Sequence, residues 1–101
     1  MNIALFGKPF YKKHQDSVKR VVERVTEIDP GALIYDEFKL ELEKYMEPPS
    51  SLGTFSKASD LKGIDLLITL GGDGTFLESV TYASAKGIPI LGIPDLGFYI
   101  K

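Results

Sequence analysis

The sequence contains no cysteine, and His14 is its only histidine in 101 residues. Without cysteine, the chain cannot form disulfides, thiolate zinc sites or a cysteine nucleophile. It also contains no apolar run near the roughly 20 residues that a membrane span requires. The first apolar run, residues 3–6, is too short for the core of a signal peptide. We therefore expect a cytoplasmic protein.

An excess of charge of one sign is also absent. Twelve Lys and Arg residues stand against 14 Asp and Glu residues, which gives a net charge of −2 at pH 7. Such a balance provides neither a broad basic surface for nucleic acid nor one for anionic lipid, so we expect neither as a partner. A chain of this length, 44% hydrophobic and 26% charged, is typical of one small globular domain with one core.

Short apolar runs alternate with stretches of helical periodicity. Strands are predicted at residues 2–6, 32–35, 65–70 and 90–93, with a short fifth strand at residues 98–100. Helices are predicted at about residues 13–28, 36–46 and 75–85, with Asp36 as the cap of the second, a loop at residues 48–53 and a helical turn near residues 56–61. This alternation predicts an α/β fold, a three-layer, flavodoxin- or Rossmann-like parallel sheet of 4–5 strands in the order 2-1-3-4-5.

The most informative segment is residues 70–77, Leu-Gly-Gly-Asp-Gly-Thr-Phe-Leu. Three glycines surround one carboxylate where a predicted strand leads into a predicted helix. Glycine allows a ligand to approach the backbone closely, and a helix start offers free N–H groups and a positive dipole end to an anion. The segment is not a P-loop, because no lysine follows, and it is not a Rossmann fingerprint, because residue 77 is Leu. The segment therefore indicates a nucleotide or phosphate site that differs from both of these motifs.

A purely structural interpretation accounts for part of this segment. Thr75 as N-cap and Glu78 reaching back would form a capping box, and we expect Glu78 to act in this way. Phe76, Val80 and Ala83 are predicted to face inward, although Phe76 could instead pack near an adenine. Capping does not explain the glycines at 71, 72 and 74.

A second turn reaches the same edge of the predicted sheet. Gly7-Lys8-Pro9 follows the first strand, and in parallel α/β sheets ligands bind beyond the carboxyl ends of the strands. Lys8 forms a small basic cluster with Lys12 and Lys13. These lysines could face phosphates, or they could be the solvated start of a helix, and we expect the latter.

The stretch Gly-Gly-Asp-Gly-Thr-Phe-Leu closely resembles the signature of NAD kinases, the enzymes that phosphorylate NAD to NADP with ATP. The shorter Gly-Gly-Asp-Gly also occurs in diacylglycerol and sphingosine kinases and in phosphofructokinases. Residues 88–93 and 96–98 are similar to the family's Ile-Pro-Ile-Leu-Gly-Ile-Asn-x-Gly-x-Leu-Gly-Phe stretch, which favours NAD kinase. The resemblance covers the whole chain as the N-terminal α/β domain of the family.

This resemblance implies roles for individual residues. Asp73 would be the general base that accepts the proton of the adenosine ribose 2′-hydroxyl, which then attacks the γ-phosphate of ATP. The nucleotide would be bound by Gly71, Gly72, Asp73, Gly74, Thr75 and Phe76. ATP and Mg²⁺ or another divalent cation are implied as cofactors and NAD as the substrate, with no residue assigned as a metal ligand.

The sequence departs from the family pattern in two ways that lower the activity we expect. Only Pro94 and Asp95 stand where the family usually has Asn-x-Gly-x, and family members continue into a β-rich C-terminal domain. We therefore expect residues 1–101 to be a single truncated or engineered α/β domain with little or no activity alone. A non-enzymatic flavodoxin-like scaffold and a fragment of a diacylglycerol- or sphingosine-type lipid kinase are the alternatives. A homodimer is left open.

Overall fold

The computed structural model describes residues 1–93 of the chain, apart from the side chains of Asp73 and Ala85. The strands are β1 (Ile3–Gly7), β2 (Leu33–Tyr35), β3 (Gly53–Phe55), β4 (Leu66–Leu70) and β5 (Ile90–Ile93). The α-helices are α1 (Gln15–Ile28), α2 (Asp36–Leu42) and α3 (Asp73–Ala83), and the 3₁₀ helices are η1 (Lys12–His14), η2 (Ala58–Leu61) and η3 (Ser84–Lys86). Among the described residues, no helix combines the length and the apolar character that crossing a membrane requires.

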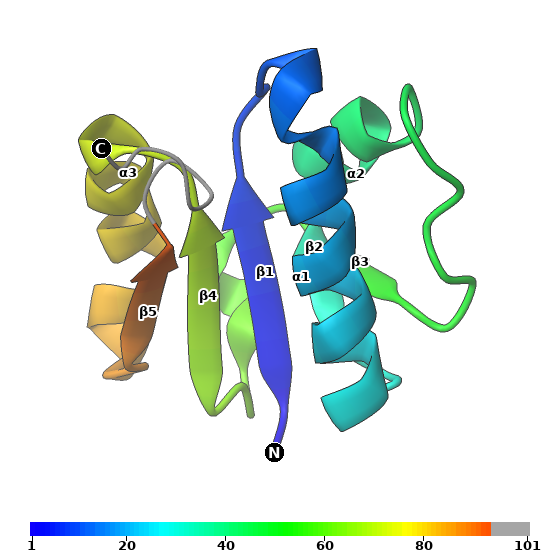
Figure 1. Ribbon diagram of the computed structural model, residues 1–101. Helices are drawn as coiled ribbons and strands as arrows, with labels where there is room; N and C mark the ends of the chain where they lie inside the picture. Colours follow the sequence, from blue (N-terminus) through cyan, green and yellow to red (C-terminus); the bar gives the residue numbers. More distant parts are fainter. Residues whose placement is uncertain (94–101) are drawn as a thin grey trace.

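All five strands are parallel, in the order β3-β2-β1-β4-β5 (Figure 1). The predicted α/β class is confirmed, and so is the relative order of the four predicted strands that lie within the described residues. The stated order 2-1-3-4-5 is wrong at one edge, because β3 was not predicted. Its three residues are too few to show alternation, and they pair with β2 through the register of Ile34 with Thr54. The predicted strand at residues 98–100 lies outside the described residues.

Helices cover both faces of the sheet. In Figure 1, α1 crosses in front of the sheet, while α3 lies behind β4 and β5. On the α3 side, the rings of Phe6, Tyr35, Phe55 and Tyr82 form a cluster with centroids 4.7–5.9 Å apart. This aromatic cluster ties three strands to α3 and forms a large part of the core.

The predicted helix boundaries need three corrections. The first helix is split, because η1 precedes an α-helix that begins only at Gln15. The second ends at Leu42 rather than at Met46, and Asp36 is its first residue rather than its cap. The residue before it, Tyr35, is the last residue of β2, so the strand leads directly into the helix and leaves no room for a separate capping residue. The third begins at Asp73, two residues earlier than expected.

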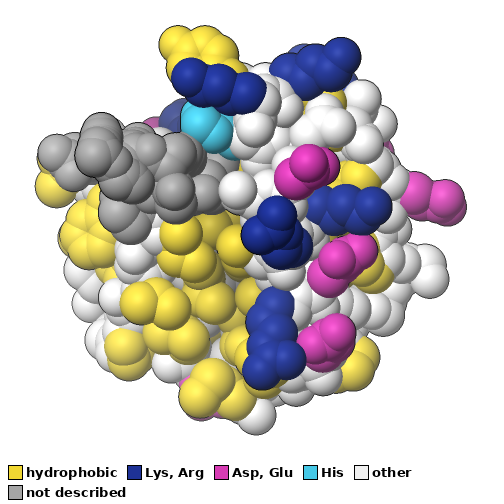
Figure 2. All heavy atoms as spheres, in the orientation of Figure 1, with side chains coloured by type: hydrophobic (Ala, Val, Ile, Leu, Met, Phe, Trp, Pro, Cys, Tyr) yellow, Lys and Arg dark blue, Asp and Glu magenta, His cyan; other side chains and the backbone are white. Residues whose placement is uncertain are grey.

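The described residues leave part of the front face of the sheet uncovered by a helix. Figure 2 shows hydrophobic side chains gathered on the front face over β4 and β5, beside the charged side chains on α1. The register pairs Ile68 with Leu91 and Leu70 with Ile93, so these side chains share that face. Leu91 is 50% exposed and Ile93 is half-buried. We call this surface the β4–β5 face.

Candidate functional site

The glycine turn connects β4 directly to α3. Gly71 has a φ of 141°, a value that favours glycine, and its N–H donates to the carbonyl of Ile93 at 3.1 Å. Gly72 is the N-cap of α3, and its carbonyl accepts the N–H of Phe76 at 3.0 Å, which closes the first helical turn. The N–H groups at the start of a helix have no partner within it and favour an anion. The turn therefore presents backbone donors at the carboxyl edge of the sheet.

A cleft of about 420 Å³ lies in front of this turn. Its walls come from the loop after β1, from the end of β4 and the turn after it, and from α2. The described residues that line it are Lys8, Pro9, Phe10, Tyr11, His14, Phe38, Leu70, Gly71, Gly72 and Thr75. The two turns that follow β1 and β4, predicted separately from the sequence, thus meet across one cleft, because parallel strands end at the same edge.

Only some of the predicted nucleotide-binding residues are among the described residues that line the cleft. Gly71, Gly72 and Thr75 line the cleft, whereas Gly74 and Phe76 are not among its described lining residues. Phe76 is 38% exposed, so it is less buried than an inward-facing residue was predicted to be. Its ring lies against Gly92, where an added Cβ would come within 2.9 Å of it. Asp73 is the first residue of α3, directly beside the cleft-lining Gly72.

Two other positions of α3 differ in burial from what the periodicity predicts. Ala83 is fully buried, as predicted, but Val80 is only half-buried. The fully buried residue next to Val80 is Ser79, which was not predicted to face inward. Ser79 is tolerated there because its hydroxyl donates to the carbonyl of Phe76 at 2.6 Å. The helix therefore presents a small polar residue to the core in place of a larger apolar one.

The predicted capping box is also wrong. Gly72, not Thr75, is the N-cap, because the helix begins two residues before the position that the pattern suggested. Thr75 instead packs against Gly71, where an added Cβ would lie 2.8 Å from its Oγ1. The Glu78 carboxylate pairs with Lys8 instead, with Oε1 2.9 Å from Nζ.

The structure adds an aromatic wall that sequence reasoning missed. Phe10 packs edge-to-face on Phe38 at 6.1 Å between centroids and lies 5.2 Å from Tyr45. Tyr11 is 75% exposed at the opening of the cleft. The signal that could have found this wall is the pair of adjacent aromatic residues that directly follows Gly7-Lys8-Pro9. Aromatic side chains beside a backbone anion site suit a nucleotide, which has a base to pack against and phosphates to bind.

Lys8 is the one Lys or Arg among the described residues that line the cleft. The hydrogen bond to Glu78 raises the pKa of Lys8 above its ordinary value, with a smaller opposing effect of desolvation. The ammonium group is therefore charged at neutral pH.

Among the described residues, no group of three or more His, Asp or Glu side chains could hold a metal ion. The polar groups that line the cleft include the Lys8 ammonium, the Thr75 hydroxyl and backbone N–H groups, and such donors fit phosphate oxygens.

Comparison with known proteins identifies the family. A family model described as the ATP-NAD kinase N-terminal domain matches residues 10–99. The chain belongs to this family. The membership confirms the resemblance that the glycine turn and residues 88–98 indicated.

Relatives within the ATP-NAD kinase family match nearly the whole chain. NAD kinase of Cytophaga hutchinsonii is 35% identical over 101 residues, which is 97% of this chain and 35% of that protein. NAD kinase of Flavobacterium psychrophilum is 33% identical over 94 residues, which is 92% of this chain and 32% of that protein. The chain therefore spans about a third of the length of these relatives.

A solved structure shows the same fold. The crystal structure of yeast NADH kinase complexed with NADH matches 93% of this chain and 29% of its own, with a TM-score of 0.67 and 20% sequence identity. The parallel sheet with helices on both faces is thus a fold that this chain shares with part of that protein.

Proposed function

We propose that this chain supplies the nucleotide-phosphate-binding part of an NAD kinase that phosphorylates NAD to NADP with ATP. The observation that carries the proposal is the cleft at the carboxyl ends of β1 and β4, where Gly71 and Gly72 lead into α3 and face an aromatic wall. Phosphoryl transfer depends chiefly on positioning and on charge neutralisation, which backbone donors and a lysine can supply. Family membership favours this function over a lipid kinase.

Asp73 is our candidate for the general base. It stands in the first turn of α3, next to Gly72, where bound phosphates would meet the N–H groups of the helix. There it would accept the proton of the ribose 2′-hydroxyl as the oxygen attacks the γ-phosphorus and ADP leaves. Gly71, Gly72, Gly74, Thr75 and Phe76 complete the nucleotide-binding set that we propose.

We also propose that a divalent cation arrives with ATP. Mg²⁺ keeps several water ligands and is held in such reactions largely through substrate phosphates. The described donors of the cleft would bind the phosphate oxygens that the cation leaves free. The cytoplasm, where NAD and ATP are available, is the location we propose.

Little or no turnover is expected from the chain alone, because one open face of a small sheet cannot exclude water from two nucleotides. Binding is the direct test. We expect ATP at millimolar concentration to raise the melting temperature of the chain, since a ligand that binds only the folded state stabilises it. Adenosine is the control without phosphates. If neither ATP nor NAD raised the melting temperature, the non-enzymatic scaffold would be favoured.

Self-association is a further part of the proposal. The β4–β5 face exposes apolar side chains, among them Leu91 at 50% exposure. We propose that a second copy of the chain covers this face when the chain is studied alone, since exposed apolar surface of this kind drives association.

A further inference from the structure

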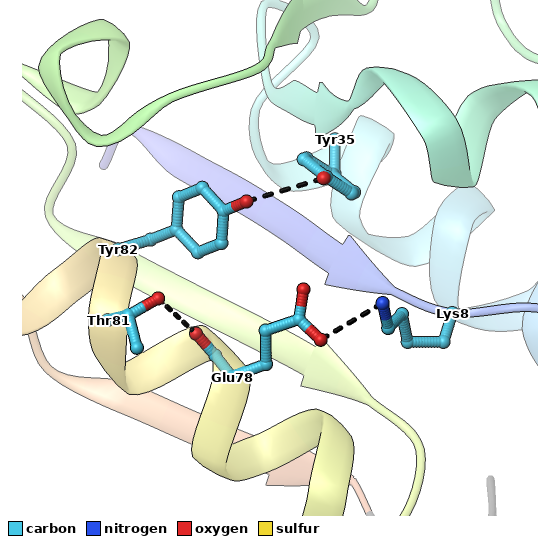
Figure 3. A network of polar contacts seen from close by, with 5 residues as sticks. All are labelled: Lys8, Tyr35, Glu78, Thr81 and Tyr82. Carbon is cyan, nitrogen blue, oxygen red and sulfur yellow. Dashed lines mark hydrogen bonds and ion pairs between the residues drawn. The ribbon is translucent and has the colours of Figure 1, made fainter.

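The ion pair between Lys8 and Glu78 joins two elements at the wall of the cleft. Lys8 directly follows β1, and Glu78 lies in the middle of α3 (Figure 3). The distance from Nζ to Oε1 is 2.9 Å, with 42% of the lysine side chain and 37% of the glutamate side chain exposed. The pair therefore lies within reach of solvent and of any ligand in the cleft.

Only one partner of this pair lines the cleft. Lys8 is the one Lys or Arg among the described residues that line it, and it stands across from Gly71, Gly72 and Thr75. Glu78 comes one turn after Thr75 on α3 and is not among the described lining residues. Lys8 thus lines the cleft while its ammonium is paired with a carboxylate that is not among the described lining residues.

The other groups that act on the ammonium do not replace Glu78. Glu37 and the Tyr82 hydroxyl add weaker attraction from α2 and α3. Tyr82 itself is engaged with Tyr35, oxygen to oxygen at 3.3 Å (Figure 3). Glu78 is therefore the dominant partner of Lys8 when the cleft holds no anion.

A phosphate chain can compete with this partner. Ion pairs between half-exposed side chains contribute little net stability, because water solvates both charges well. A polyphosphate carries several negative charges, and a lysine binds phosphate as a point charge on a flexible stem. Rotation of the lysine side chain would move the ammonium from the carboxylate to the phosphate with no change in the backbone.

We propose that Lys8 binds the phosphate chain of a nucleoside polyphosphate in the cleft, and that Glu78 competes with this chain for the same ammonium group. The inference rests on the proposed nucleotide site and adds a specific residue to it. Inorganic polyphosphate offers the same chemistry as ATP, so both belong in the test.

Calorimetric titration of the 101-residue chain with ATP, tripolyphosphate and adenosine tests the proposal. We expect Lys8→Met to weaken binding of both polyphosphates about tenfold and to leave adenosine unchanged. We expect Glu78→Gln to tighten polyphosphate binding about threefold by removing the competitor. In the double variant this tightening should disappear, because no ammonium remains to be released.

Two further variants serve as controls. Lys12→Met removes a lysine of the same cluster that is not among the described lining residues, and it should change ATP affinity less than twofold. Lys8→Arg keeps the positive charge and should retain most of the affinity. Comparable melting temperatures would show that each variant is folded.

The outcomes separate this inference from the proposed function. ATP binding that is unchanged in Lys8→Met would overturn the inference and leave the nucleotide site in place. Equal tightening by Glu78→Gln with and without Lys8 would also overturn it. Glu78 would then weaken polyphosphate binding through its negative charge alone and not by competing for the Lys8 ammonium. Lys8-dependent binding of tripolyphosphate with no preference for ATP would support the inference and count against a nucleotide site. No polyphosphate binding by any form would overturn both.

Discussion

At the scale of single residues, the hydroxyl of Thr69 is buried without a hydrogen-bond partner among the described residues. Its side chain is 1% exposed, and no described residue forms a hydrogen bond with its Oγ1. It lies on β4 between Phe6 of β1 and Gly92 of β5. A buried hydroxyl without a partner lowers stability, because it loses its hydrogen bonds to water on folding.

Replacing Thr69 with Val should therefore not destabilise the fold. Valine has nearly the same shape without the hydroxyl, so we expect the free energy of unfolding to rise by about 1 kcal/mol. Urea denaturation measures this change. Thr69→Ser keeps the hydroxyl and loses a methyl group, so it should lower stability. A loss of more than about 1 kcal/mol in the valine variant would show that the hydroxyl has a partner.

A second residue-scale prediction concerns Tyr35. The hydrogen bond with Tyr82 and, next, burial raise the pKa of Tyr35 far above its ordinary value. Above about pH 10 the unfolded chain loses this proton while the folded chain keeps it. The Tyr35 contribution to stability is thus complete below that pH and is lost as the pH rises further. Unfolding followed between about pH 8 and pH 11 should show a steeper decline for the parent than for Tyr35→Phe; parallel curves would be inconsistent with the raised pKa.

Individual side-chain contacts were the least predictable feature from the sequence. The pattern at Thr75 and Glu78 satisfies a capping box, but the helix start at Asp73 moves both residues out of its positions. Glu78 then meets Lys8, which is 70 positions earlier in the chain. No local pattern reports such a contact, because it depends on β1 and β4 lying side by side.

At the scale of elements, the segment that leads from β4 into α3 contains two glycines with different explanations, Gly71 in the turn and Gly74 in the first turn of the helix. At Gly71 the fold itself requires glycine, because φ is 141° and an added Cβ would lie 2.8 Å from Thr75 Oγ1. At Gly74 an added Cβ would meet no described atom within 4 Å outside its own helix backbone. The fold alone therefore does not explain Gly74, which our proposal explains by a ligand that approaches the backbone.

Gly74→Ala separates these explanations. Alanine favours the helix over glycine, so we expect the free energy of unfolding to stay equal or to rise by up to about 1 kcal/mol. The same variant should reduce the ATP-dependent rise in melting temperature. Gly63→Ala, at a positive φ of 83° away from the cleft, is the control that should lower stability and leave the ATP effect intact. Unchanged ATP stabilisation of Gly74→Ala would remove Gly74 from the binding set.

Most elements were predictable because each carries a local signal. Continuous apolar runs identify β1 and β4, and the 3.6-residue periodicity of valines identifies α1. The strand β3 has only three residues and exists because β2 offers an open edge to pair with. The cleft was predictable as an edge of the sheet, but its aromatic wall depends on how α2 packs beside the loop after β1.

At the scale of the whole molecule, the coverage of the sheet is uneven. The charged side chains of α1 lie over one part of the front face, while the β4–β5 face remains apolar (Figure 2). Parallel sheets are normally buried on both faces. No helix of the described residues covers the β4–β5 face, so we expect the chain to associate through this surface when it is studied alone.

Leu91→Glu should suppress this association. Leu91 is 50% exposed at the centre of β5, so a charge there costs the monomer little and disfavours an apolar contact. Sedimentation velocity should show the parent as a dimer and the variant as a monomer. Leu40→Glu, at a site 63% exposed on α2, is the matched control and should remain dimeric. A monomeric parent would contradict the proposed contact.

The most direct test of the account measures NADP formation by a chimera. Residues 1–93 would be joined to the remaining two thirds of the Cytophaga hutchinsonii NAD kinase, in parallel with an Asp73→Asn form. With NAD, ATP and Mg²⁺, we expect the parent chimera to form NADP and the asparagine form to be about 10³-fold slower, since a general base contributes at this level. Asp16→Asn, at an exposed position in the first turn of α1, is the control that should keep full activity. An asparagine form within about threefold of the parent would contradict the role of Asp73 as base.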